Sequence, residues 1–235
     1  MKSIYTSGEY LESNRTWHLE DSAWKADQIY SLLNKNDVHP RVVAEIGCGA
    51  GAILSELSQK NGFSDGVKFK GYDISPQAIE LANSRSSDRL TFFCEDMFLA
   101  AGSDVPDVLL VIDVFEHVPD YMGFVSKCRL AAKFKVYHIP LDIHASSVLR
   151  NTFDHTRQRL GHIHLFTASS AIATLRDTGH EIVDQYYTDG ALGLFKQHPS
   201  IKRAVANIPR WLFSKFSVPF TARLLGGYSL LVLAN

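Results

Sequence analysis

Short apolar runs alternate with longer amphipathic segments along most of the chain. Seven runs predict strands: VVAEI (42–46), VKFKGYDI (67–74), RLTFFCEDM (89–97), PDVLLVIDV (106–114), KFKVYHIPLD (133–142), HEIVDQYYTD (180–189) and GYSLLVLAN (227–235). The segments with helical character are 20–36, 51–60, 75–84, 119–132 and 167–179. Because strands and helices alternate, the pattern indicates an α/β fold with a mainly parallel sheet and helices on both faces.

Two segments interrupt this alternation. The His-rich stretch 143–166 is predicted to be irregular, and residues 191–226 read as a helical, aromatic and basic insertion broken by prolines. We therefore expect one domain over residues 1–235, divided into an N-terminal helix and lid (1–40), a core (41–189), the insertion (190–226) and the last strand (227–235).

Composition and charge narrow the class of protein. With 46% hydrophobic and 21% charged residues, the chain reads as an ordinary globular protein. The net charge of −1 provides no global field for nucleic acid or an anionic membrane. Three cysteines suit a reducing compartment, and neither a signal peptide nor a membrane span is evident. We expect a cytoplasmic protein, with nucleic acid disfavoured as a partner and the oligomeric state left open.

The first predicted strand runs into a glycine loop. Glu45 is followed by Gly47, Gly49 and Gly51, and glycines in such a loop let the backbone approach a ligand closely. The spacing also satisfies the loose dinucleotide pattern G-x-G-x-x-G/A, so glycine spacing alone does not decide the ligand. The acid two residues before the first glycine, and the third glycine at 51, favour a smaller zwitterion over a pyrophosphate.

The next strand ends carry groups that suit an adenosine. In parallel sheets ligands bind beyond the carboxyl ends of the strands. There Asp73 could accept hydrogen bonds from two ribose hydroxyls, and Ile74 could cover an adenine face. Asp96 could accept from the adenine amino group, beside apolar Met97. Each residue also has a purely structural interpretation, but it is improbable that the residues at all of these strand ends are purely structural.

These motifs together resemble a known family. The order E-x-G-x-G-x-G, Y-D-I-S, E-D-M and D-V-F-E-H-V is similar to class I S-adenosylmethionine-dependent methyltransferases, most of all the small-molecule branch with the quinone and sugar methyltransferases. The resemblance implies a Rossmann-like seven-stranded sheet with its last strand antiparallel, and S-adenosylmethionine as cofactor with S-adenosylhomocysteine as product. It also implies the cofactor-binding residues Glu45, Gly47, Gly49, Gly51, Asp73, Ile74, Asp96, Met97, Asp113 and Val114.

Histidines are the candidate bases for a hydroxyl acceptor, because imidazole titrates near neutral pH. His117, after the fourth strand, and His144, after the fifth, are the predicted catalytic residues. His117 could equally fix the entry to the next helix. His138 is as readily a core residue, and an orienting role for His162 is the simpler interpretation.

A divalent cation is a further, disfavoured possibility. The residues Asp113, Glu116 and His117, with the later His162 or His164, are similar to the E-x-x-E-H plus His set of small-RNA 2′-hydroxyl methyltransferases. There a metal would bind and acidify the acceptor hydroxyl. In this chain the first acid is Asp rather than Glu.

The acceptor pocket is expected to be built from the least patterned segments of the chain. Trp17, His18 and Trp24 are candidates for a lid over cofactor and substrate, although Trp24 could simply anchor the first helix. We expect methyl transfer to a small-molecule hydroxyl, on a sugar or secondary metabolite, with an acidic or lipid-linked acceptor suggested by the basic insertion. An NAD-dependent oxidoreductase and a non-catalytic scaffold of the same fold remain alternatives.

Overall fold

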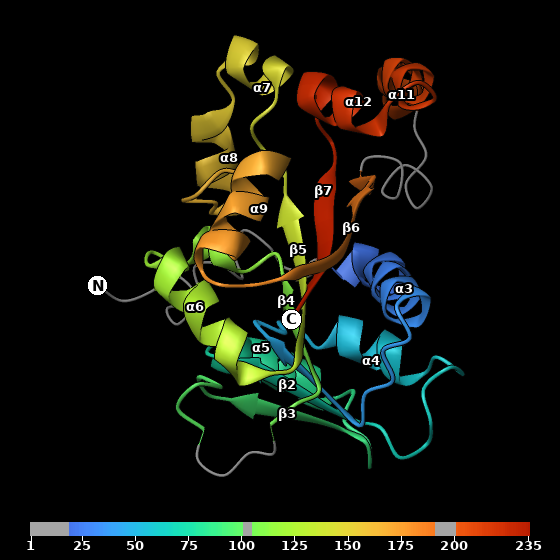
Figure 1. The fold of residues 1–235 in the computed structure, drawn as a ribbon, viewed down its shortest axis with the longest axis vertical. Helices are drawn as coiled ribbons and strands as arrows, with labels where there is room; N and C mark the ends of the chain where they lie inside the picture. The colour runs from blue at the N-terminus through green and yellow to red at the C-terminus, as the bar shows by residue number, and fades with distance from the viewer. Residues whose placement is uncertain (1–18, 101–104, 191–200) are drawn as a thin grey trace.

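A seven-stranded sheet forms the centre of the molecule (Figure 1). The computed structural model describes residues 19–100, 105–190 and 201–235. The strands run in the order β3-β2-β1-β4-β5-β7-β6. They are β1 (Val42–Ile46), β2 (Lys68–Asp73), β3 (Leu90–Cys94), β4 (Val108–Ile112), β5 (Phe134–Pro140), β6 (Ile182–Thr188) and β7 (Ser229–Ala234). β7 runs antiparallel to both of its neighbours, β5 and β6, as predicted.

Helices cover both faces of the sheet and create two apolar cores. They are α3 (Leu19–Lys35), α4 (Ala52–Ser58), α5 (Pro76–Asn83), α6 (Tyr121–Ala131), α7 (Ala145–Arg150), α8 (Phe153–Leu160), α9 (Ala168–Asp177), α11 (Ile201–Ser214) and α12 (Val218–Leu225), with the 3₁₀ turn η1 (Phe115–His117). Helices α3, α4 and α5 bury their apolar residues in one core. Helices α6 and α9 bury theirs in the other, on the opposite face.

The central strands explain why the sheet is covered on both sides. All five residues of β4, Val-Leu-Leu-Val-Ile, are buried, which is the continuous apolar pattern of a strand between two helical layers. In register, Ile46 of β1 lies opposite Tyr72 of β2 and Val111 of β4. The carboxyl ends of these strands therefore meet at one edge, where the glycine loop, Asp73 and Asp113 follow directly.

The prediction that residues 143–166 are irregular is wrong. This stretch contains α7 and α8. Helix α7 begins with a capping box in which His144 and Ser147 exchange side-chain hydrogen bonds. Helix α8 has no buried residue, so it lacks the apolar stripe on which a periodicity argument depends.

The described part of the predicted insertion is helical, as α11 and α12. Both helices connect β6 to β7 and lie at the end of the sheet where the parallel strands finish (Figure 1). Within the described ranges, no helix is both long enough and apolar enough to cross a membrane.

Candidate functional site

The glycine loop after β1 has the backbone that its composition predicted. Gly47, Gly49 and Gly51 have φ angles of +69°, +52° and +74°, which side chains rarely adopt. A Cβ on Gly47 would stand 2.8 Å from Val114 Cγ2, so the loop passes close to the end of β4. A Cβ on Gly51 would overlap the Phe92 ring. Gly51 thus serves packing of the loop on β3 as well as the turn.

Asp73 ties the glycine loop to the end of β2. Its Oδ2 accepts the backbone N–H of Gly49 at 2.9 Å, and its Oδ1 accepts that of Ser75 at 2.8 Å. Burial raises the pKa of this carboxyl, and these backbone hydrogen bonds oppose the shift. Ile74 beside it is 50% exposed although apolar, as expected for a residue that covers a flat ligand.

The end of β3 presents one exposed and one buried residue. The exposed Asp96 accepts the Phe98 backbone N–H at 2.9 Å, and Met97 packs into the core on that face. The Asp96 carboxylate can accept further hydrogen bonds from the solvent side, at the edge of the sheet where Asp73 also lies.

Glu45 is the acid most altered by its surroundings. It is 1% exposed, and its Oε2 has no hydrogen-bond partner among the described residues. Burial, with repulsion from Asp73 and Asp113, raises its pKa to about 8 against the attraction of Lys25. A buried carboxyl lacking a partner is costly, and a cation placed beside the loop would satisfy it.

A buried ion-pair network joins α3 to the end of β4. Lys25 Nζ lies 2.9 Å from Asp21 Oδ2 and 2.8 Å from Asp113 Oδ2. His138 Nδ1 lies 2.6 Å from Asp113 Oδ1, and its Nε2 lies 2.9 Å from Thr188 Oγ1. His138 and Lys25 hold the pKa of Asp113 well below its usual range, and the two acids raise the pKa of Lys25 despite burial. Asp113 is therefore committed to this network and does not join the predicted metal set.

Sequence reasoning missed Lys25, although a signal was present. In α3, Ser22, Lys25 and Ala26 stand seven, four and three residues before the buried Ile29, on the stripe that faces the sheet. A lysine on the apolar stripe of a helix requires a buried acid, because an unpaired charge there is prohibitively costly. The positive φ of Asp113, +53°, marks the same place.

A pocket of about 200 Å³ opens beside this network, beyond the ends of β4 and β5. Its lining includes Trp24, Lys25, Asp113, His117, His138 and His162. The Trp24 ring meets His138 edge-on, with centroids 6.2 Å apart. Of the predicted lid residues, Trp24 thus lines the pocket, while Trp17 and His18 lie outside the described residues.

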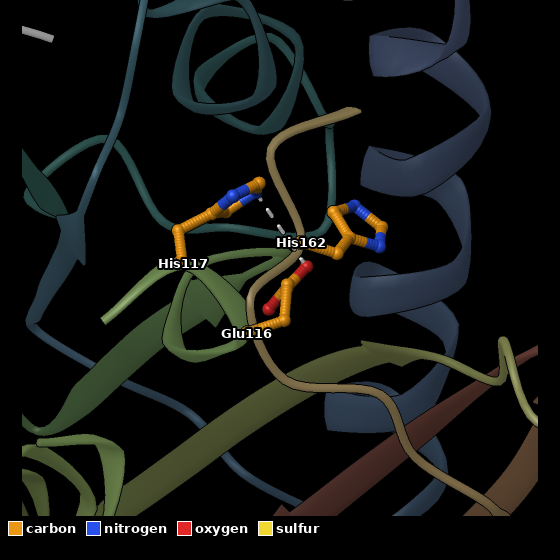
Figure 2. A group of neighbouring side chains, drawn as sticks. All are labelled: Glu116, His117 and His162. Atoms are coloured by element: carbon orange, nitrogen blue, oxygen red, sulfur yellow. Dashed lines mark ion pairs between the residues drawn. The ribbon is translucent and has the colours of Figure 1, made fainter. Parts of the chain in front are cut away.

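Glu116, His117 and His162 form a cluster at this pocket (Figure 2). One ligand atom from each lies within 4.8 Å of the others, and the Glu116 carboxyl lies between the two imidazoles. His117 Nδ1 lies 3.0 Å from the Gly161 carbonyl oxygen, and His162 Nδ1 lies 2.7 Å from Asp142 Oδ2. These partners favour the Nδ1–H tautomer of both rings and leave each Nε2 with its lone pair.

Glu116 stands out within the cluster. Its carboxyl is fully buried, and neither oxygen has a hydrogen-bond partner among the described residues. His117 Nε2 is 4.0 Å from Glu116 Oε1, beyond hydrogen-bond distance. Burial, together with the nearby Asp113 and Asp142, holds the pKa of Glu116 well above its usual range.

The remaining histidines have structural positions. His144, a predicted catalytic residue, caps α7: its Nδ1 accepts the Ser147 N–H at 3.1 Å, and its ring packs against Gly226. It is not among the residues that line the pocket. His164 Nε2 lies 3.1 Å from the Val118 carbonyl oxygen, and this ring stays outside the cluster. A polar residue before a short helix can serve as its cap, so His144 has a structural role in addition to the catalytic role that stays a prediction.

Known proteins are similar to this chain in sequence and in fold. The ubiquinone biosynthesis O-methyltransferases of Vibrio cholerae and Vibrio campbellii are 24% and 28% identical to it over 132 and 133 residues. Both alignments cover 52% of this chain. The chain spans about half the length of these curated relatives, 52% of the Vibrio cholerae protein and 54% of the Vibrio campbellii protein.

Among solved structures, the magnesium protoporphyrin IX methyltransferase of Synechocystis PCC 6803 with bound SAH has the same fold. It has a TM-score of 0.59 at 16% identity, over 90% of this chain and 82% of that one. A model of the family described as "Methyltransferase domain" matches residues 17–185. The chain therefore belongs to the methyltransferase domain family, which confirms the resemblance to the class I S-adenosylmethionine-dependent methyltransferases.

Proposed function

We propose that this protein transfers a methyl group from S-adenosylmethionine to a hydroxyl of a small-molecule acceptor bound in the pocket beside β4 and β5. Family membership and the strand-end groups support the cofactor. The observation that carries the hydroxyl is the His162–Asp142 pair at that pocket, because a neutral hydroxyl must lose its proton during methylation.

The cofactor fits the groups at the glycine loop. Glu45 has a buried oxygen that no described residue hydrogen-bonds, which suits the ammonium of a methionine. Gly47 leaves no room for a side chain, so the loop backbone can follow the ligand closely. Asp73, Ile74 and Asp96 would hold the ribose and adenine. When bound, S-adenosylmethionine supplies an electrophilic methyl group on sulfonium, and S-adenosylhomocysteine remains after transfer.

The residues of the pocket would align the acceptor and remove its proton. His162 lines the pocket and donates Nδ1–H to Asp142, which leaves the lone pair that a base needs on Nε2. The acceptor oxygen forms its bond to the methyl carbon while its proton passes to Nε2. Trp24 and His117 border the same space and would orient an aromatic or ring-shaped acceptor.

The buried Glu116 favours a second way of activating the same hydroxyl. A divalent cation held by the Glu116 carboxylate and the Nε2 atoms of His117 and His162 would satisfy two carboxyl oxygens that have no hydrogen-bond partner in the described part of the chain. Imidazole and carboxylate ligands suit a first-row transition metal. Such an ion would lower the pKa of a bound hydroxyl. Asp113 takes no part, since Lys25 and His138 hold it.

Acceptor screening tests the proposal. With methyl-labelled S-adenosylmethionine, we expect label to enter phenols, catechols or sugars at oxygen. His162→Ala should lower turnover by a factor of about 10² to 10⁴, the usual contribution of a positioned base. The control is His155→Ala, an exposed histidine of α8. Label entering only amines would contradict a hydroxyl acceptor.

Calorimetry separates the two modes of activation. Titration of wild type and Glu116→Gln with Mn²⁺ and Zn²⁺ should show a site lost in the variant but kept in Glu80→Gln, an exposed control on α5. Absence of metal binding would leave His162 acting alone as the base.

The two rival functions give different results in the same experiments. S-adenosylhomocysteine binding without methyl transfer to any acceptor would support the scaffold, and NAD binding would support the oxidoreductase. Family membership weighs against the oxidoreductase. The ubiquinone biosynthesis relatives support an acceptor with a lipophilic part. The basic insertion supports an acceptor that is acidic or linked to a lipid.

A further inference from the structure

Helices α11 and α12 present large apolar side chains to solvent. We define the α11–α12 surface as the exposed Ile208, Trp211, Leu212, Phe213, Phe216 and Phe220. Phe216, between the two helices, is 89% exposed, and Leu149 of neighbouring α7 is 85% exposed. Single exposed apolar residues are ordinary, but a contiguous group of aromatic ones marks an interaction site.

Helix α11 is oriented with its polar side toward the protein. Asn207 is buried, and Arg210, half-buried, donates to its Oδ1 at 2.9 Å. Arg210 also donates to the carbonyl oxygens of Gly226 and Leu225, at 2.9 and 3.3 Å, at the end of α12. The opposite side of α11, with Ile208, faces outward. A surface helix normally buries its apolar stripe, so this reversed orientation indicates that the stripe has another partner.

Helix α7 packs against the end of α12 and holds the α11–α12 surface in place. Ser146 of α7 donates to the Leu225 carbonyl oxygen of α12 at 3.4 Å, and His144 packs on Gly226. Helices α7, α12 and α11 lie side by side across the end of the molecule (Figure 1). This is the end at which β5 finishes and β7 begins, so the surface and the pocket share one end of the sheet.

Charge identifies the kind of partner. Residues 190–235 contain six basic side chains and no acid, whereas residues 1–189 carry 18 basic and 25 acidic ones, a net of −7. Lys215 and Arg223 are exposed, and Lys215 Nζ lies 3.6 Å from the Trp211 ring centroid. Aromatic rings beside flexible cations suit the boundary between anionic headgroups and acyl chains, where the rings enter the apolar layer and the cations stay with the headgroups.

We propose that the α11–α12 surface docks the protein on an anionic lipid bilayer. Phe216 and Trp211 enter the headgroup–acyl boundary, and Lys215 and Arg223 pair with anionic headgroups. Docking in this way brings the pocket end of the sheet close to the membrane, where a lipophilic acceptor would be dissolved. The proposal stands apart from methyl transfer, since it concerns binding alone.

Vesicle co-sedimentation tests it, with phosphatidylcholine vesicles alone and with phosphatidylglycerol added. We expect binding that requires the anionic lipid. Phe216→Glu should weaken it at least about tenfold, since a buried Phe contributes about 1.5–3 kcal/mol. The double variant Lys215→Gln/Arg223→Gln should lose about fivefold for each charge, as expected from about 1 kcal/mol per basic residue.

The matched control is Leu130→Glu, a 75% exposed apolar residue on α6 at the opposite end of the sheet, which should bind as wild type does. S-adenosylhomocysteine binding, measured on each variant, checks that the fold is kept. Equal binding by Phe216→Glu, or no binding to either vesicle, overturns the proposal. Self-association in sedimentation velocity that Phe216→Glu abolishes, without vesicle binding, would assign the surface to a second copy of the chain.

Discussion

Replacing Glu45 by Gln should stabilise the fold and weaken cofactor binding, two effects of opposite sign. Glu45 is 1% exposed, one of its oxygens has no hydrogen-bond partner among the residues that the structure describes, and its pKa is raised from 4.5 to about 8. The folded state therefore holds a proton that the unfolded chain releases above pH 4.5. By linkage, this group's contribution to stability is complete below pH 4.5 and is lost as pH rises to about 8. Gln has nearly the same shape and no proton to lose.

The magnitude follows from the size of the shift. Each pH unit above 4.5 costs the wild type about 1.4 kcal/mol relative to the variant, until the carboxyl ionises in the folded state near pH 8. At pH 7 the variant should be more stable by about 3 kcal/mol. Lys25 opposes the shift, and Asp73, Asp113 and the buried Cys48 thiol are the other ionisable groups that Glu45 faces.

Urea unfolding of both proteins at pH 5, 6, 7 and 8 measures the difference directly. The gain in free energy of unfolding should grow with pH, while the urea dependence stays the same. Calorimetry at pH 7 should show S-adenosylhomocysteine binding weakened about 10- to 100-fold, since a hydrogen bond to a charged group contributes about 1.5–3 kcal/mol. A stability difference independent of pH would refute the assignment of a protonated Glu45, and unchanged affinity would refute its contact with the ligand.

Three other substitutions test separate parts of the site. Lys25→Met should lower the free energy of unfolding by up to about 3–5 kcal/mol, because it leaves half-buried Asp113 without that cation. Lys25→Met/Asp113→Asn should recover part of the loss in the same urea assay, and no recovery would argue against the pair. Gly47→Ala should cost about 1–3 kcal/mol, from its φ of +69° and the approach to Val114, and should weaken S-adenosylhomocysteine binding in calorimetry. His144→Ala should cost about 1 kcal/mol through its lost cap and leave methyl-transfer turnover intact, whereas a folded variant without turnover would support the predicted catalytic role.

The fold was predictable because its signals are local and repeat along the chain. The central strand Val108–Ile112 is apolar throughout, and Ser75 with Pro76 marks the start of α5, so sequence position and structure agree there. Helix α8 was missed because it buries nothing and leaves no periodic trace. The cap at His144 was not predicted, because a histidine after a strand can serve as a cap or as a base, and spacing along the chain does not show its neighbours.

By itself, the sequence determined the seven strands and their order along the chain, the cofactor family and the glycine loop, because each depends on residues close together in the chain. Tertiary structure decided how distant side chains are paired. It paired Lys25 of the first described helix with Asp113, which lies outside the cluster of Glu116, and brought His162 close to His117. It also turned the apolar side of α11 to solvent. Such pairings depend on how the chain packs across the sheet, which periodicity along one segment does not encode.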